Sequence, residues 1–135
     1  MGGRGPLSKL NILYVDDHED VRDVVEYSLQ LDAEIDVRVA GSGAQALEML
    51  DENQFRPDVI LLDVMMPHMD GLTVLAAIRT RAPFQKTPVI FITARTQSRE
   101  ISAFNALDII GVITKPFDPL ELAPEVREIL RRSGE

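Results

Sequence analysis

Short apolar runs alternate with segments of helical periodicity along most of this chain, and that alternation is what most limits its fold. Nearly unbroken apolar runs are typical of strands buried on both faces of a sheet. The sequence predicts strands at 10–15, 35–40, 59–64, 88–94 and 111–114. The run at 59–64 is expected to be the most buried, and that at 35–40 more exposed.

Each predicted strand is followed by apolar residues at helical spacing. The predicted helices begin after the DDHED segment, at Ala44, at Asp70-Gly71, at Ser98 and at Asp118-Pro119. The one at Ser98–Leu107 is only weakly amphipathic. Asp118 is a good N-cap, and Pro119 suits the first position of the last helix. The sequence therefore predicts five strands alternating with five helices.

Strict alternation of strands and helices determines the fold class. Right-handed crossovers between successive strands give a parallel sheet with helices on both faces. We predict an α/β fold, a three-layer doubly wound five-stranded parallel sheet with the flavodoxin-like order 2-1-3-4-5. In such sheets ligands bind beyond the carboxyl ends of the strands, at the switch point between strands one and three.

Length, composition and charge limit the kind of protein this chain can be. A chain of 135 residues fits one domain, and 45% hydrophobic residues suffice for a sizeable core. A net charge of −8 argues against direct nucleic-acid binding, and no apolar run is long enough for a membrane span. With no cysteine, thiol catalysis is excluded. We expect a cytoplasmic globular domain after a flexible leader at residues 1–8.

Polar residues stand at four of the five predicted strand ends. They are Asp16 and Asp17, Asp63, Thr93 and Lys115. Each has a simpler explanation when taken alone: the aspartate pair could cap a helix, Thr93 could reflect strand propensity, and Lys115 could be a solvated loop residue. Asp63 is harder to explain so, because a carboxylate in so apolar a strand needs a partner or a cation. Together, the residues indicate one site.

The charges of these residues indicate the chemistry. At an effective dielectric constant of 20, two carboxylates ~4 Å apart repel each other by roughly 4 kcal/mol. Three carboxylates are neutralised by Lys115 together with one divalent cation, and oxygen ligands favour Mg²⁺, with Mn²⁺ as an alternative, over zinc. Carboxylates, a divalent ion, a lysine and a hydroxyl suit phosphoryl transfer, with Asp63 as the nucleophile.

The ordered motifs YVDDHEDVR, VILLDVMMPHMDG, PVIFITA and ITKPF resemble the receiver domain of two-component response regulators. The resemblance extends over Leu10 to Arg132 and places the receiver domain at residues 9–133. It implies a signalling domain that catalyses only its own phosphotransfer and dephosphorylation. Its partners would be a sensor histidine kinase or phosphotransfer protein, and a downstream target protein or a missing output domain.

The resemblance also assigns roles to the strand-end residues. Asp63 would accept a phosphoryl group from a phosphohistidine. Asp17, Asp63 and the Met65 carbonyl would bind Mg²⁺, and Asp16 would hold it through water. Thr93 and Lys115 would contact the phosphoryl oxygens, and the Lys115-Pro116 bond would be cis. Phosphorylation would be reported to the face of helix four, strand five and helix five, through which dimers could form.

Several positions depart from the family pattern, or have an effect on the domain that the sequence does not predict. Val112 stands where the family often has an aromatic switch residue. Pro124 lies inside the last predicted helix, which should kink there or begin late. Met65 and Arg95 occupy positions that tune the phosphoryl lifetime. His18 and His68 are interpreted as ordinary exposed loop histidines.

Three other functions fit parts of the sequence. Residues 41–46, GSGAQA, fit the G-x-G-x-x-A pattern of a dinucleotide site, but they follow the second strand and leave the acidic residues unexplained. An aspartyl-phosphate hydrolase would need a second acid where this chain has Met65. A receiver that has lost its chemistry and only binds proteins is disfavoured by the retained Asp63, Thr93 and Lys115.

Overall fold

The computed structural model describes residues 9–52, 55–94 and 107–134. The predicted leader at 1–8, nearly all of the predicted helix at Ser98–Leu107, and Arg95 lie outside these ranges. The strands are β1 (Leu10–Val15), β2 (Ile35–Ala40), β3 (Val59–Asp63), β4 (Val89–Thr93) and β5 (Gly111–Thr114). The helices are α1 (Glu19–Gln30), α2 (Gly43–Asp51), α3 (Gly71–Arg79), the short 3₁₀ turn η1 (Ala82–Phe84) and α5 (Leu122–Ser133).

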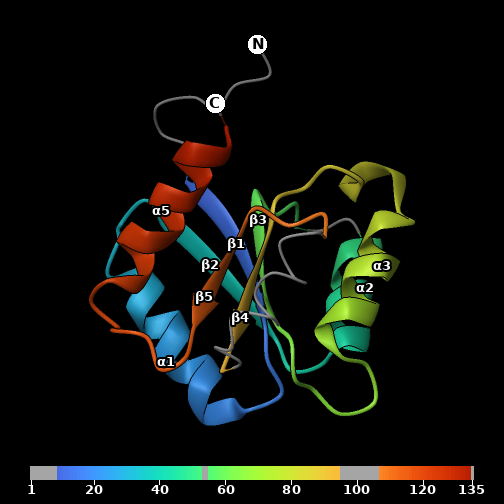
Figure 1. Ribbon diagram of the computed structural model, residues 1–135, viewed down its shortest axis with the longest axis horizontal. Helices are drawn as coiled ribbons and strands as arrows, with labels where there is room; N and C mark the ends of the chain where they lie inside the picture. Colours follow the sequence, from blue (N-terminus) through green and yellow to red (C-terminus); the bar gives the residue numbers. More distant parts are fainter. Residues whose placement is uncertain (1–8, 53–54, 95–106, 135) are drawn as a thin grey trace.

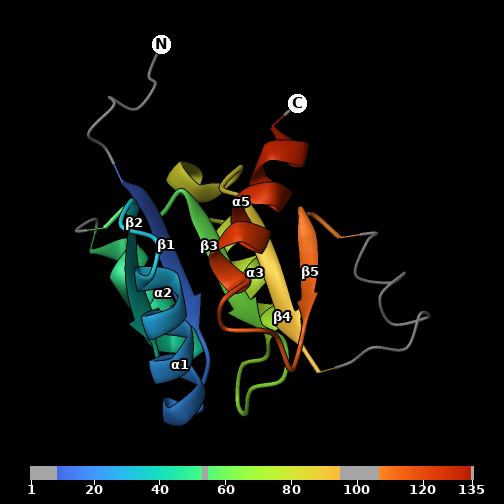
Figure 2. The same cartoon turned by 90° about the vertical axis from the view of Figure 1, so that its left-hand side faces the viewer.

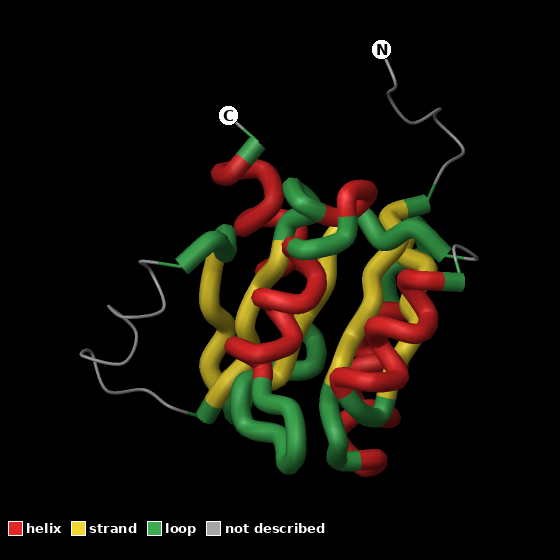
Figure 3. Tube along the Cα trace, turned by 90° about the vertical axis from the view of Figure 1, so that its right-hand side faces the viewer, coloured by secondary structure: helices red, strands yellow, loops and turns green. Residues whose placement is uncertain are grey.

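The five strands form one parallel sheet in the order β2-β1-β3-β4-β5, which confirms the predicted fold class. Helices α1 and α5 cover one face and α2 and α3 the other, so the molecule has three layers (Figure 1). Seen from the α1 and α5 side, the strands run the same way, with all their carboxyl ends at one edge (Figure 2). The loops that follow β1, β2, β3 and β5 gather at that edge (Figure 3).

Alternate residues of the central strands enter opposite cores. Ile12 and Tyr14 pack with Val25 of α1 and with α5, while Leu13 and Val15 pack on the α2 and α3 side. Side chains two residues apart on a strand therefore share a face. Tyr14 and the next residue of that parity, Asp16, are both fully buried.

The amino ends of α2 and α3 follow ordinary capping rules. Ser42 accepts a hydrogen bond from the Gln45 N–H, and Gln45 Oε1 accepts one from the Gly41 N–H. Asp70 caps α3 by accepting from the Thr73 N–H, and α3 begins at Gly71, where the sequence predicted a helix start. At α1 the N-cap residue is His18 and no side chain caps the helix, so capping does not account for Asp16 and Asp17.

The predicted start of the last helix is wrong. Asp118 and Pro119 lie in a turn, where Asp118 Oδ1 accepts from the Leu120 N–H, and α5 begins at Leu122 with Glu121 as its N-cap. Pro124 thus occupies the first turn of α5, where its missing N–H needs no partner in the helix. Of the two consequences expected from Pro124, the late start is the one observed.

Close packing fixes α3 against the end of β3. A Cβ on Gly71 would lie 2.7 Å from the backbone oxygen of Asp63 and 2.8 Å from Val64 Cα. The Gly71 N–H also donates to the Val64 carbonyl, at 2.9 Å. Only glycine allows this approach, which anchors the backbone that carries Asp63. Among the described residues, no helix has both the length and the apolar character needed to cross a membrane.

Candidate functional site

The carboxyl edge of the sheet brings the predicted strand-end residues together. Asp16 follows β1, Asp63 ends β3, Thr93 ends β4 and Lys115 follows β5. Asp16 and Thr93 are fully buried, and Asp63 is 3% exposed. Burial of two carboxylates side by side is unfavourable unless hydrogen bonds and opposite charges compensate it.

Asp16 is held by donors on both of its oxygens. Oδ2 accepts a hydrogen bond from the Tyr14 hydroxyl and lies 3.1 Å from Lys115 Nζ, and Oδ1 accepts from the His18 N–H at 2.9 Å. Burial raises the pKa of Asp16, but the hydrogen bond from Tyr14, with help from His18 and Lys115, outweighs it and holds that pKa below its usual value. Asp16 is therefore a fixed negative charge.

Asp63 has fewer compensating contacts. Its Oδ1 lies 3.5 Å from Lys115 Nζ, so the single ammonium serves two carboxylates. Burial, together with the negative charge of Asp16, raises the pKa of Asp63 to about 6, against the lowering effects of Lys115 and the Met65 backbone N–H. The site therefore carries more negative charge than its described residues neutralise.

Asp17 and His18 complete an acidic cluster beside Asp63. One ligand atom from each of Asp16, Asp17, His18 and Asp63 lies within 4.8 Å of the others. Asp17 Oδ1 is buried and, among the described residues, accepts no hydrogen bond, although His18 Nδ1 is 3.2 Å away. A buried carboxylate oxygen of this kind fits a divalent cation, which prefers oxygen ligands and would supply the missing positive charge.

Tyr14 is a part of the site that sequence reasoning missed. Its hydroxyl is fully buried, and burial with the neighbouring Asp16 raises the pKa of Tyr14 far above its usual value, so it remains a donor. Its place in the apolar run LNILYV predicts only a residue of a buried strand. The available signal was its position two residues before Asp16, which puts both side chains on one face of the sheet.

His18 also differs from its sequence interpretation. Its side chain is 64% exposed, as expected for a loop histidine, yet Nδ1 lies 3.2 Å from oxygens of both Asp16 and Asp17. His68 is exposed, has a backbone φ of 68°, and is not part of the acidic cluster. The two histidines therefore differ in their relation to the site.

The remaining predicted positions lie around this cluster. The Thr93 carbonyl accepts from the Lys115 N–H at 2.8 Å, and the Lys115-Pro116 peptide bond is cis, as the resemblance implied. Met65 is 51% exposed just after β3. Val112 is partly buried in β5 and packs on the α2 and α3 side of the sheet.

The glycine pattern at 41–46 has a structural explanation. Ser42 and Gln45 form the cap of α2, and a Cβ on Gly43 would lie 2.5 Å from Val74 Cγ2 and 2.9 Å from Met69 Sδ. Gly43 is thus needed for the packing of α2 against α3 and the loop before it. No dinucleotide is required to account for these residues.

Comparison with known proteins agrees with this geometry. The family model of the response regulator receiver domain matches residues 12–127. The transcriptional regulatory protein CpxR of Escherichia coli strain K12 is 38% identical over 122 residues, which cover 90% of this chain and 50% of CpxR. The chain spans about half the length of the curated relatives it matches.

Solved structures give the same result. The chemotaxis protein CheY4 of Vibrio cholerae superposes with a TM-score of 0.80 at 31% identity, covering 90% of this chain and 99% of that chain. The Mn²⁺-bound form of the response regulator Rcp1 has a TM-score of 0.72 at 27% identity, covering 88% of this chain and 90% of that chain.

Fold, acidic cluster and sequence matches agree on one class, the receiver domains of two-component signalling. The chain belongs to the response regulator receiver domain family. Members of this family are signalling domains rather than classical enzymes, and they typically bind Mg²⁺ in an acidic pocket. They interact with histidine kinases and output domains.

Proposed function

We propose that this receiver domain accepts a phosphoryl group on Asp63 from a phosphohistidine of a sensor histidine kinase or phosphotransfer protein. The observation that carries the proposal is the placement of Lys115 Nζ between Asp16 and Asp63, at 3.1 and 3.5 Å, on the carboxyl edge of the sheet. A carboxylate beside a fixed cation in a mostly buried site is well placed to attack phosphorus.

In the transfer, an Asp63 carboxylate oxygen forms the new P–O bond as the N–P bond of the phosphohistidine breaks. The electron pair of that bond stays on the imidazole nitrogen, which takes up a proton. Lys115 and the Thr93 hydroxyl bind the phosphoryl oxygens. The salt bridge between Lys115 and the Asp63 carboxylate is then replaced by one between Lys115 and the phosphoryl group.

The residues present fit one divalent ion. Asp17, Asp63 and the Met65 carbonyl would hold it, and Asp16 would hold it through water. The ion, Mg²⁺ or Mn²⁺, would neutralise charge on the phosphoryl oxygens during transfer. Support comes from Asp17 Oδ1, which has no hydrogen-bond partner among the described residues, and from the Mn²⁺ that the related Rcp1 structure holds. A hydrolase is disfavoured because Met65 stands where the second acid would be needed.

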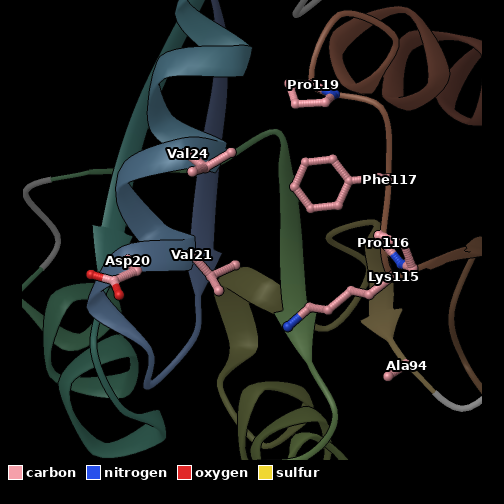
Figure 4. A pocket seen from close by; sticks show the side chains of 8 residues that line it. All are labelled: Asp20, Val21, Val24, Ala94, Lys115, Pro116, Phe117 and Pro119. Atoms are coloured by element: carbon pink, nitrogen blue, oxygen red, sulfur yellow. The ribbon is translucent and has the colours of Figure 1, made fainter.

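A groove beside Lys115 supports contact with a phosphodonor protein. The groove has a volume of about 420 Å³ and is lined mainly by apolar side chains of α1 and of the segment after β5. Val21 and Val24 face Phe117 and Pro119 across it (Figure 4). Lys115 also lines the groove, and its Nζ lies 3.1 Å from Asp16 Oδ2. A donor protein seated here would hold its phosphohistidine next to Asp63 and Lys115.

Output would follow from a change in partner binding. We propose that Thr93 shifts toward the phosphoryl group and that this shift alters the face of helix four, strand five and helix five, of which the structure describes β5 and α5. This face would then bind a target protein, an output domain or a second receiver. The net charge of −8 favours output through protein contacts rather than direct contact with nucleic acid.

The test of the proposed function is phosphorylation by a small phosphodonor. The chain is incubated with Mg²⁺ and acetyl phosphate, and the intact mass is measured. We expect one phosphate increment, which Asp63→Asn and chelation each abolish. Asp23→Asn, an exposed aspartate on α1, should be phosphorylated like the wild type. An increment that survives Asp63→Asn, or no increment at all, would contradict the proposal.

A further inference from the structure

The position of His18 adds a nitrogen donor to the acidic cluster. Nδ1 lies 3.2 Å from Asp16 Oδ1 and 3.2 Å from Asp17 Oδ1. The backbone holds the residue there, because its N–H donates to Asp16 Oδ1 at 2.9 Å and its carbonyl accepts from the Arg22 N–H at 3.0 Å. The His18 backbone is thus fixed at the start of α1, within reach of both carboxylates.

Asp16 and Asp17 differ in whether they have a carboxylate oxygen that could still bind a metal ion. Both oxygens of Asp16 already receive donors, from Tyr14, Lys115 and the His18 N–H. Asp17 Oδ1 is buried and has no hydrogen-bond partner among the described residues. His18 Nδ1 lies 3.2 Å from this Asp17 oxygen and shares a contact of the same length with Asp16 Oδ1, so it is the nitrogen that a metal ion bound by Asp17 would meet.

The spacing of the cluster suits a single ion. All its ligand atoms lie within 4.8 Å of one another. Opposite ligands of a six-coordinate ion at about 2.1 Å are roughly 4.2 Å apart, so small side-chain movements bring Asp17, His18 and Asp63 to one ion. Imidazole nitrogen binds first-row transition ions well, whereas Mg²⁺ strongly prefers oxygen.

We infer that His18 Nδ1 is a metal ligand in this chain and gives its acidic site a preference for first-row transition ions, such as Co²⁺ and Mn²⁺, over Mg²⁺. The inference rests on the metal site of the proposed function but not on phosphoryl transfer. His18 acts here as a selectivity-determining ligand beside the oxygen ligands of Asp17 and Asp63.

The first test measures binding of the metal alone to the full chain at pH 8, by calorimetric titration with Co²⁺ and with Mg²⁺. We expect His18→Ala to weaken Co²⁺ binding about tenfold or more and to change Mg²⁺ binding by less than about threefold. His18→Asp, which replaces the nitrogen with oxygen, should lower the ratio of Co²⁺ to Mg²⁺ affinity as well. The chain has only two histidines, and His68→Asn is the matched control, since asparagine tolerates a positive φ.

The second test asks whether nitrogen is bound directly. Pulsed electron paramagnetic resonance of the Mn²⁺-loaded chain should show nitrogen coupling in the wild type and in His68→Asn, and none in His18→Ala. Coupling that persists in His18→Ala, or is absent from the wild type, would overturn the inference. Phosphorylation of Asp63 with Mg²⁺ would then still stand, whereas failure of the wild type to bind any divalent ion would count against both.

Discussion

The Tyr14 hydroxyl donates a hydrogen bond to Asp16 Oδ2, and both residues are fully buried. The same oxygen lies 3.1 Å from Lys115 Nζ. Tyr14 thus helps to keep Asp16 ionised without adding a charge to the site. That leaves the ammonium of Lys115 shared between Asp16 and Asp63, which is the arrangement the proposed phosphoryl transfer needs.

We expect Tyr14→Phe to destabilise the domain. The variant keeps the ring in the core but leaves a buried carboxylate oxygen without one of its donors, which costs about 1.5–3 kcal/mol at pH 7. Because the folded-state pKa of Asp16 lies below its unfolded value, the stability that its ionised form contributes is lost as pH falls through the folded pKa. The difference between the variant and the wild type should therefore shrink in acid.

Urea unfolding of the wild type and the variant over a pH series measures this difference. Tyr27→Phe is the matched control, because Tyr27 is the only other tyrosine and is 67% exposed on α1. It should change the free energy of unfolding by less than about 0.5 kcal/mol. Equal effects of the two substitutions would show that the Tyr14 hydroxyl does not stabilise Asp16.

Asp63→Asn should stabilise the metal-free domain at neutral pH. The pKa of Asp63 is raised to about 6, so the folded state binds more protons than the unfolded state between pH 4 and 6. Stability falls as pH rises through that window, and above it the ionised carboxylate costs about 3 kcal/mol. Replacing it with a neutral amide should recover up to that amount at pH 7 and almost nothing below pH 4.

Thermal and urea unfolding with a chelator present, at pH 3.5 and at pH 7, provide the measurement. Adding Mg²⁺ should then stabilise the wild type more than Asp63→Asn, because the ion binds the folded state through Asp63. Asp23→Asn again serves as the control, with no pH-dependent gain expected. A variant less stable than the wild type at pH 7 would contradict the cost assigned to burying the ionised Asp63 carboxylate beside Asp16.

The fold could be predicted from the sequence because its signals are local and agree with each other. The apolar strands and the cap at Asp70 each specify their own segment, and alternation leaves few topologies open. The predicted start of α5 was wrong, and the reason is also local. A helix beginning at Pro119 would place Pro124 in its interior, facing the Leu120 carbonyl, and the ring excludes that arrangement.

The site could be predicted only in part. Asp63, Thr93 and Lys115 were found because parallel strand ends meet at one edge whatever the details of packing. The roles of Tyr14 and His18 depend on how the side chains and the turn after β1 are oriented. A tyrosine in an apolar run and a histidine in a polar loop have the same local sequence whether or not they touch a carboxylate.

Gly71→Ala should disturb the backbone of Asp63. The added Cβ would lie 2.7 Å from one backbone atom and 2.8 Å from another, and neither can move as a flexible side chain can. We expect a loss of about 1–3 kcal/mol in the free energy of unfolding and slower phosphorylation by acetyl phosphate. Gly41→Ala is the control, since its Cβ would come no closer than 3.2 Å to any other atom and would meet side-chain ends rather than backbone, so we expect a smaller loss in both assays.

Val24→Asp should separate partner docking from chemistry. Val24 is 46% exposed and lines the apolar groove beside Lys115, so a carboxylate there would be desolvated by any protein seated on the groove. With a phosphorylated histidine kinase that transfers to the wild type, we expect transfer to fall about tenfold or more. Phosphorylation by acetyl phosphate should change little, because the small donor needs no groove.

Leu72→Asp places the same charge at a similarly exposed aliphatic position, on α3 across the sheet, and should leave both rates unchanged. Equal loss with both phosphodonors would mean that Val24 affects Asp63 itself, and unchanged transfer from the kinase would place the docking surface elsewhere.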